Sequence, residues 1–148
     1  MKYFLLYFLI SLTTPLAAQV DNIEKISFQS LSRGYFENVV ITQDSLIIRK
    51  SENRGSVEQT TRRYLTKKEW KSLVRDLSKV ILSDIPVLKS PTAKRTYDGA
   101  RHSSIIIYTT DGSSYEHLFD NEDPNDKLEP LMKCIISIRD RIDGALLD

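Results

Sequence analysis

The chain of 148 residues carries 21 Lys and Arg against 20 Asp and Glu, which gives a formal net charge of +1. This balance excludes the class of strongly basic proteins that bind nucleic acid through their overall charge. Its single cysteine, Cys134, excludes an intramolecular disulfide, so the fold must be held by packing of the core. Because Cys134 lies between apolar neighbours in a predicted helix, we expect a buried, inert thiol.

The N-terminus has the order of a secretory signal peptide. One cation, Lys2, precedes an apolar run over residues 3–12, and small residues follow up to Ala18. The run is about half as long as a membrane-spanning helix needs to be. We therefore expect a signal peptide over residues 1–18 and a single domain over residues 19–148, exported to the periplasm or secreted. No later stretch is long and apolar enough to span a membrane.

The first part of the expected domain is rich in β-type residues with short turn signals between them. The predicted strands cover residues 23–30, 35–42, 45–50 and 57–64. Connections this short favour antiparallel neighbours, so we expect a β-meander.

The hydrophobic period then changes to 3.6 residues, which predicts a helix from Lys67 to Leu82. Thr66 and Glu69 have the spacing of a capping box at its start. Trp70 falls on the apolar face of this helix, so we expect its side chain to be largely buried.

A second hairpin and a second helix follow an irregular, proline-containing connection. Residues 103–110 and 113–119 flank Asp111-Gly112, a dipeptide that suits a two-residue type I′ turn. Asp126 and Glu129 predict a capping box for the last helix, which places Pro130 at its fourth position and removes one backbone hydrogen bond.

These elements predict an α+β fold. The meander and the hairpin should form one antiparallel sheet, with both helices packed on one face because each helix has a single apolar stripe. A degenerate ββα duplication is an alternative organisation, since both halves of the chain are strands followed by a helix.

No motif in the chain selects an enzyme, a metal or a cofactor. With a two-residue turn, His117 pairs with Ile106, and His102 lies on the same face roughly 13 Å away, too far to share a metal ion. The acidic loop over residues 120–126 lacks the glycine and the final glutamate of a helix–loop–helix calcium site. There is no Gly-x-Ser-x-Gly elbow and no glycine-rich phosphate loop.

Charge is segregated along the chain. Residues 49–79 hold ten cations and four anions, whereas residues 111–148 hold four cations and ten anions. A row of four cations at i,i+4 spacing costs about 0.2–0.5 kcal/mol for each adjacent pair. The row consists of Lys67, Lys71, Arg75 and Lys79. Either the acidic half of the fold offsets this cost, or the row is a docking surface for an anionic partner.

The C-terminal half also resembles a known group of proteins. The residues that carry the resemblance are Tyr97-Asp98-Gly99-Ala100, Ile105 to Tyr108, Asp111-Gly112, Tyr115, Phe119-Asp120 and Leu128-Glu129-Pro130-Leu131. This string is similar to the C-terminal half of small uncharacterised exported proteins of Bacteroidetes-type bacteria. The resemblance covers about residues 97–140, and it implies export but no particular activity.

The sequence therefore favours a non-enzymatic binding or interaction module of the periplasm or cell exterior. The basic row would bind an anionic envelope component or an acidic protein surface. Nucleic acid is not expected as a partner, because export separates the protein from it. The alternative is a small hydrolase-like or ligand-binding protein, whose site would consist of Tyr97, Asp98, His102 and His117.

Overall fold

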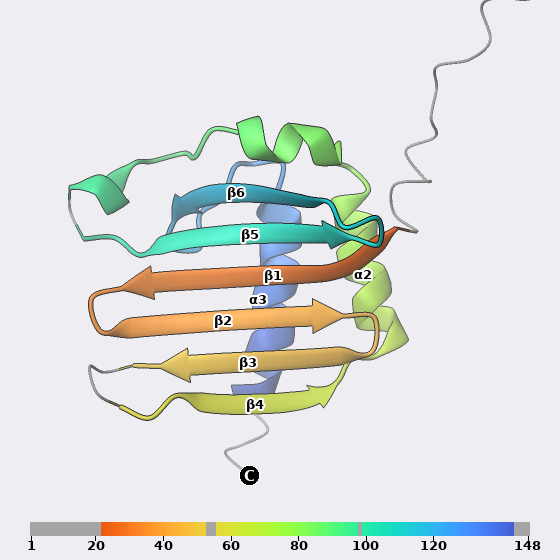
Figure 1. The fold of residues 1–148 in the computed structure, drawn as a ribbon, viewed down its shortest axis with the longest axis horizontal. Helices are drawn as coiled ribbons and strands as arrows, with labels where there is room; N and C mark the ends of the chain where they lie inside the picture. Colours follow the sequence, from red (N-terminus) through yellow and green to blue (C-terminus); the bar gives the residue numbers. More distant parts are fainter. Residues whose placement is uncertain (1–21, 53–55, 98, 144–148) are drawn as a thin grey trace, which may run out of the picture.

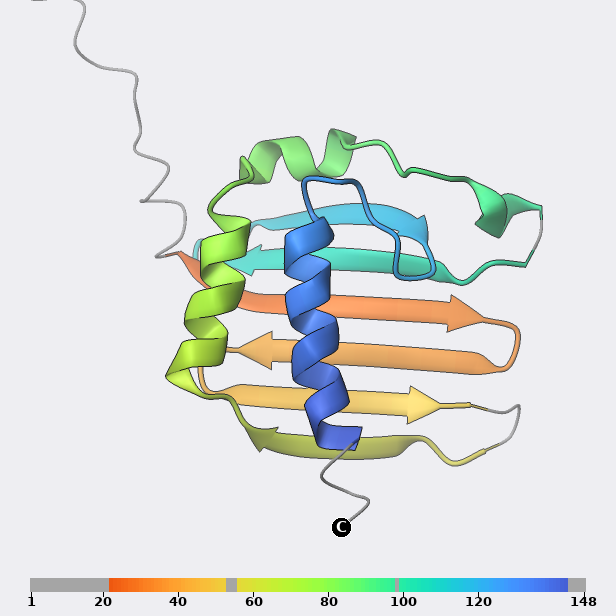
Figure 2. The same ribbon diagram turned by 180° about the vertical axis from the view of Figure 1, so that it is seen from behind.

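The structure is a computed structural model that describes residues 22–52, 56–97 and 99–143. The predicted signal peptide over residues 1–18 lies outside the described residues. The described residues form one six-stranded open sheet (Figure 1), and α-helices cover one face of it (Figure 2). Within the described part of the chain, no helix has the length and apolar character needed to cross a membrane.

The first four strands form the predicted meander. They are β1 (Ile23–Ser32), β2 (Tyr35–Thr42), β3 (Ser45–Ser51) and β4 (Gln59–Tyr64). Each pairs with the next in antiparallel register, as the short turns between them require.

The hairpin of β5 (His102–Thr109) and β6 (Ser114–Asp120) completes the sheet on its other side. Strand β5 pairs with β1, so the spatial order is β4-β3-β2-β1-β5-β6. Strands β4 and β5 precede and follow α2 in the sequence. They nevertheless lie far apart in the sheet. The predicted fold class is confirmed, whereas the ββα duplication stays a hypothesis.

Both helices, α2 (Lys67–Leu77) and α3 (Glu129–Asp143), cross the strands on one face, as predicted (Figure 2). The core lies between this face and the two helices. Its largest fully buried side chains include Phe28, Phe119, Ile26, Ile41, Leu46, Leu73, Leu77, Ile105, Ile107 and Leu131. Trp70 packs against this core from the apolar face of α2, as expected, but it is not fully buried.

The start of α2 was predicted correctly, but its end was not. The Glu69 N–H donates to Thr66 Oγ1 and the Glu69 carboxylate accepts from the Thr66 N–H, which forms the expected capping box. The helix ends at Leu77 rather than at Leu82. The Ser78 hydroxyl donates to the carbonyl of Arg75, which a continuing helix would use for its next N–H.

The connection that follows α2 contains two short 3₁₀-helices, η1 (Leu82–Val87) and η2 (Lys94–Thr96). Pro86 lies inside η1, where a 3₁₀ turn tolerates it better than an α-helix would. The prediction of an irregular connection agrees with this segment.

The β5–β6 turn is longer than predicted, and this changes the register of the hairpin. The Thr109 N–H donates to Ser113 O, and the Gly112 N–H donates to Thr109 O, which leaves three residues in the loop. Gly112 has φ +85°, the geometry of a type I turn followed by a left-handed residue rather than of a type I′ turn. The Asp111 carboxylate accepts from the Thr109 hydroxyl and the Ser113 N–H and holds this wider loop. His117 consequently pairs with Ile105 and not with Ile106.

Helix α3 begins at Glu129, two residues later than the predicted capping box requires. The N–H groups of Leu128 and Glu129 donate to Asn125 O and Asp126 O, in turns that precede the helix. Pro130 is therefore the second helical residue, where an N–H has no partner within the helix. The predicted loss of a backbone hydrogen bond does not occur.

The different burial of two neighbours on α2 gives a test of the packing. Leu73→Ala should lower the free energy of unfolding by about 2–5 kcal/mol, because Leu73 is fully buried. Trp70→Ala should cost about 2 kcal/mol, because only part of its ring leaves water on folding. Urea denaturation followed by circular dichroism measures both. A loss above about 4 kcal/mol for Trp70→Ala would show that the indole is a core residue.

Candidate functional site

The exposed face of α2 carries most of the predicted basic row. Lys67, Lys71 and Arg75 are exposed on the helix, whereas Lys79 lies in the turn beyond its end. Lys68 is exposed beside them. In the part of the chain that the structure describes, no carboxylate pairs with any of the three lysines of this helix.

The C-terminal end of the row is partly neutralised from within α2. Asp76 Oδ1 lies 3.5 Å from Nε of Arg75 and 3.2 Å from Nζ of Lys79, so one carboxylate faces two cations. The acidic half of the chain does not supply this charge. Its described ion pairs lie elsewhere: Asp120 with Arg95, Glu122 and Asp140 with Arg139, and Glu129 with Lys133.

A groove of about 470 Å³ runs between α2 and α3. Its polar lining from the two helices includes Lys68, Ser72, Arg75, Lys133, Ser137 and Arg141. Glu69 and Asp76 also line the groove, but both carboxylates are buried and paired. We define the α2–α3 basic surface as Lys67, Lys68, Lys71, Arg75, Lys133 and Arg141.

Glu69 holds this surface together. Arg63 of β4 donates from both guanidinium nitrogens to the Glu69 carboxylate, at 3.0 and 2.8 Å, and Arg141 of α3 lies 3.4 Å from it. The hydrogen bond from Arg63, reinforced by Thr66, outweighs burial and lowers the pKa of Glu69 to about 2. Glu69 is therefore a permanent anion that fixes the spacing of two helices, rather than a proton donor.

Cys134 lies in the same groove and is half-buried. Burial, with Asp76 next in importance, raises the pKa of its thiol. A raised pKa disfavours the thiolate, which is the reactive form. The expected burial of this thiol is therefore incomplete, and its raised pKa favours the inert thiol that the sequence predicts.

The two histidines of the alternative site lie on different faces of the sheet. Tyr97 and His102 are exposed, His117 is buried, and Asp98 lies outside the described residues. His117 shares a sheet face with its partner Ile105, so His102, three residues away on β5, points to the opposite face. The expectation that both histidines share one face was wrong, because the hairpin register differs by one residue.

His117 is a structural residue of the helix-covered face. Its Nε2 accepts a hydrogen bond from the Asn125 N–H at 3.1 Å, and its ring stacks on Phe119 at a centroid distance of 5.4 Å. Burial, assisted by the charge of Arg95, lowers the pKa of the imidazole. The neutral ring therefore connects β6 to the loop that leads into α3.

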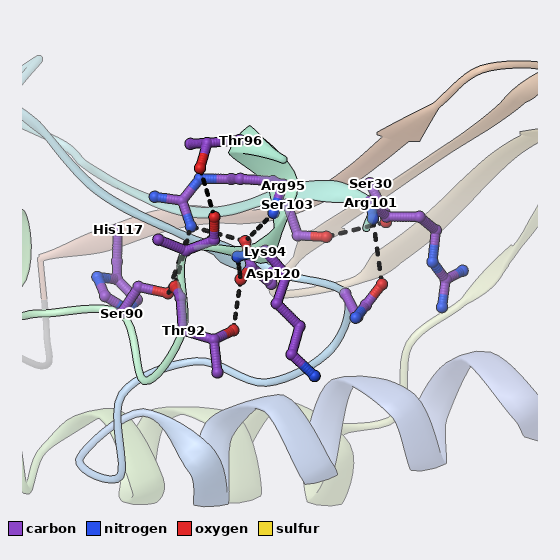
Figure 3. Close-up of polar contacts among 12 residues, drawn as sticks. Ser30, Ser90, Thr92, Lys94, Arg95, Thr96, Arg101, Ser103, His117 and Asp120 are labelled. Carbon is purple, nitrogen blue, oxygen red and sulfur yellow. Dashed lines mark hydrogen bonds and ion pairs between the residues drawn. The ribbon is translucent and has the colours of Figure 1, made fainter. Parts of the chain in front are cut away.

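Asp120 forms a second buried cluster close to His117 (Figure 3). Its carboxylate accepts from the Thr92 hydroxyl, from the Lys94 N–H at 2.7 Å, and from the N–H and guanidinium of Arg95 at 3.2 and 2.7 Å. Burial alone would raise the pKa of Asp120, but these hydrogen bonds outweigh it and hold the pKa at about 2. Asp120 thus clamps residues 92–95 to the end of β6.

Comparison with known proteins adds no function. No protein-family model matches the chain, and neither a curated protein nor a solved structure matches it. Among the described residues, no group of three or more His, Cys, Asp and Glu side chains could hold a metal ion.

Sequence reasoning found half of the α2–α3 basic surface. The i,i+4 pattern identified Lys67, Lys71 and Arg75 but not Lys68, which lies one residue outside that row. Lys133 and Arg141 come from α3, and only the packing of the two helices brings them to the groove. No local sequence signal reports that contact.

The buried imidazole predicts a pH-dependent stability. Because the folded pKa of His117 is depressed, its stabilising contribution is complete above the unfolded value of about 6.5 and is lost as the pH falls below it. Between pH 6.5 and 5 the free energy of unfolding should fall, by up to about 1.4 kcal/mol per pH unit. Urea denaturation of His117→Gln should show a flatter profile. The matched variant His102→Gln, at the exposed histidine, should keep the slope, and a slope that survives in His117→Gln would contradict this assignment.

Proposed function

We propose that this chain is an exported, non-enzymatic binding module whose α2–α3 basic surface docks an anionic polymer of the cell envelope. The observation that carries the proposal is the group of Lys67, Lys68 and Lys71. These lysines are exposed on one short helix and have no carboxylate partner in the described part of the chain. Like charges at i,i+4 spacing repel one another, and an anionic partner would remove that cost.

The type and spacing of the cations favour a polymer over a compact ligand. Lysine is a mobile point charge that needs no fixed partner geometry, unlike the planar fork of arginine. The 11 residues of α2 extend over roughly 16 Å, and Lys133 and Arg141 widen the surface across the groove. A chain with repeated carboxylate or phosphate groups can contact several of these cations at once.

The state of the buried acidic groups supports binding rather than catalysis. Glu69 and Asp120 are engaged by cations and have pKa values of about 2, so neither carboxylate exchanges a proton near neutral pH. The raised pKa of Cys134 disfavours a thiolate nucleophile. Export is supported by the charged, apolar and small-residue order of residues 1–18.

Charge reversal on α2 tests the proposal. The double variant Lys67→Glu/Lys71→Glu should keep the fold, because exposed charges contribute little to stability. Its affinity for immobilised polygalacturonate or polyphosphate should fall at least about tenfold, since each lysine near an anionic surface contributes about 1 kcal/mol. The use of both polymers distinguishes carboxylate from phosphate recognition, and neutral dextran should not bind.

The matched control is Arg33→Glu/Lys94→Glu, which makes the same charge change at two exposed positions. Arg33 lies in the β1–β2 turn and Lys94 in η2, and both segments lie at the end of the sheet away from α2 (Figure 1). This control should bind like the unmodified protein, whose binding should weaken as salt rises. Equal losses of affinity in the two double variants would show that binding depends on net charge and not on the α2–α3 basic surface. Binding to acidic proteins but to neither polymer would identify the competing partner.

A further inference from the structure

The two edges of the sheet are treated differently. The outer side of β6 is covered by η1, which packs against that strand. At the other edge, β4 pairs with β3, and no described element lies along its outer side (Figures 1 and 2). An uncovered edge presents N–H and C=O groups that can pair with another strand.

The side chains of β4 are also accessible. Gln59, Thr60, Arg62 and Tyr64 are exposed, and Tyr64 reaches 90%. One carbonyl near the end of the strand, that of Tyr64, already accepts a hydrogen bond from the Arg63 guanidinium at 2.9 Å. The rest of β4 is long enough to pair with a short extended segment.

Both a cationic side chain and an apolar hollow lie beside this edge. Arg63 reaches Glu69 on the helix-covered side, so its neighbour Arg62 points to the open face of the sheet. Arg62 has no acidic partner among the described residues. A hollow of about 500 Å³ adjoins it, with Leu46, Ile47 and Tyr64 in its lining.

A second copy of the chain is a poor occupant of the edge. Two β4 strands side by side would bring together the unmatched Arg62 side chains of both copies, whereas Arg63 of each copy is already paired with Glu69. Like charges across adjacent strands destabilise the pair, and charged residues are a common means of blocking self-association at an edge. An acidic strand has the opposite sign, so Arg62 would favour it.

We propose that β4 accepts an extended acidic segment of another protein as a seventh strand of the sheet. Main-chain hydrogen bonds to β4 would hold the segment. Acidic side chains on its open-face side would lie beside Arg62. The alternating apolar side chains would lie on the helix-covered side, where Leu46 and Arg63 line the hollow. This site is separate from the α2–α3 basic surface and does not depend on the proposed function.

Strand addition can be tested with synthetic peptides and the purified protein. The probe is a fluorescein-labelled eight-residue peptide that alternates Glu and Val, and its binding is measured by fluorescence anisotropy. We expect saturable binding that is lost when alternate backbone nitrogens of the same peptide are methylated, because methylation removes the main-chain donors. A peptide that alternates Lys and Val should bind at least about tenfold more weakly.

Variants of the protein make the test specific. Arg62→Glu should reverse the preference, so that the Lys peptide binds more tightly than the Glu peptide, and Arg62→Gln should reduce the difference between them. Lys67→Glu/Lys71→Glu should bind the Glu peptide unchanged, which separates this site from the α2–α3 basic surface. Circular dichroism checks that each variant is folded, as expected for an exposed residue.

Three outcomes would overturn the proposal. Equal binding of the methylated peptide would show attraction to surface charge without strand pairing. A Glu preference that persists in Arg62→Glu would place the peptide elsewhere. A dimer in sedimentation experiments that the Glu peptide does not displace would show that the edge belongs to a second copy, provided that Thr60→Pro abolishes it in a folded protein. The N–H of Thr60 faces away from β3, because the N–H groups of Leu65 and of the residues at every second position before it point toward β3.

Discussion

The ion pair between Arg63 and Glu69 is the interaction on which the two candidate surfaces depend. It joins the last strand of the meander to the first turn of α2, and Arg63 also donates to the carbonyl of Ile138 in α3. One side chain thus fixes the sheet and both helices at the end where they meet. Because consecutive side chains of a strand alternate, the inward direction of Arg63 forces Arg62 outward. Removal of either buried partner would leave an uncompensated charge, which is among the costliest defects in a folded protein.

Charge is balanced locally in this fold and not between the two halves of the chain. Each buried carboxylate of the described residues is paired with a cation: Glu37 with Arg139, Glu69 with Arg63, Asp76 with Lys79, and Asp120 with Arg95. The buried guanidinium of Arg139 also contacts Glu122, and its carboxylate partners raise its pKa although burial alone would lower it. In the acidic half, the paired anions contact cations of η2 and of α3: Asp120 pairs with Arg95, Glu122 and Asp140 with Arg139, and Glu129 with Lys133. The lysines of α2 remain unmatched for that reason, although the chain as a whole is almost neutral.

The sequence predicted the elements because their signals are local, and it failed where side chains compete with backbone patterns. Period-two runs located the strands, and Thr66 with Glu69 located the start of α2. The Asp111 carboxylate converts a two-residue turn into a three-residue loop, and the Ser78 hydroxyl ends a helix whose apolar period continues. Neither the Asp111-Gly112 dipeptide nor the 3.6-residue hydrophobic period indicates these side-chain hydrogen bonds. The contacts of Lys133 and Arg141 with the groove, and of Asp120 with residues 92–95, join segments remote in sequence and have no local signature.

The clamp at Asp120 has a consequence for how many molecules one sheet can join. By holding residues 92–95 against the end of β6, it helps to anchor the connection whose η1 segment covers that edge. A sheet with two free edges can extend in both directions, and repeated addition then produces a filament. Among the strands that the structure describes, β4 alone leaves an edge from which this sheet can extend. Any strand added there would terminate growth unless it brought a free edge of its own, so the stoichiometry of such an assembly is limited to one incoming segment per molecule.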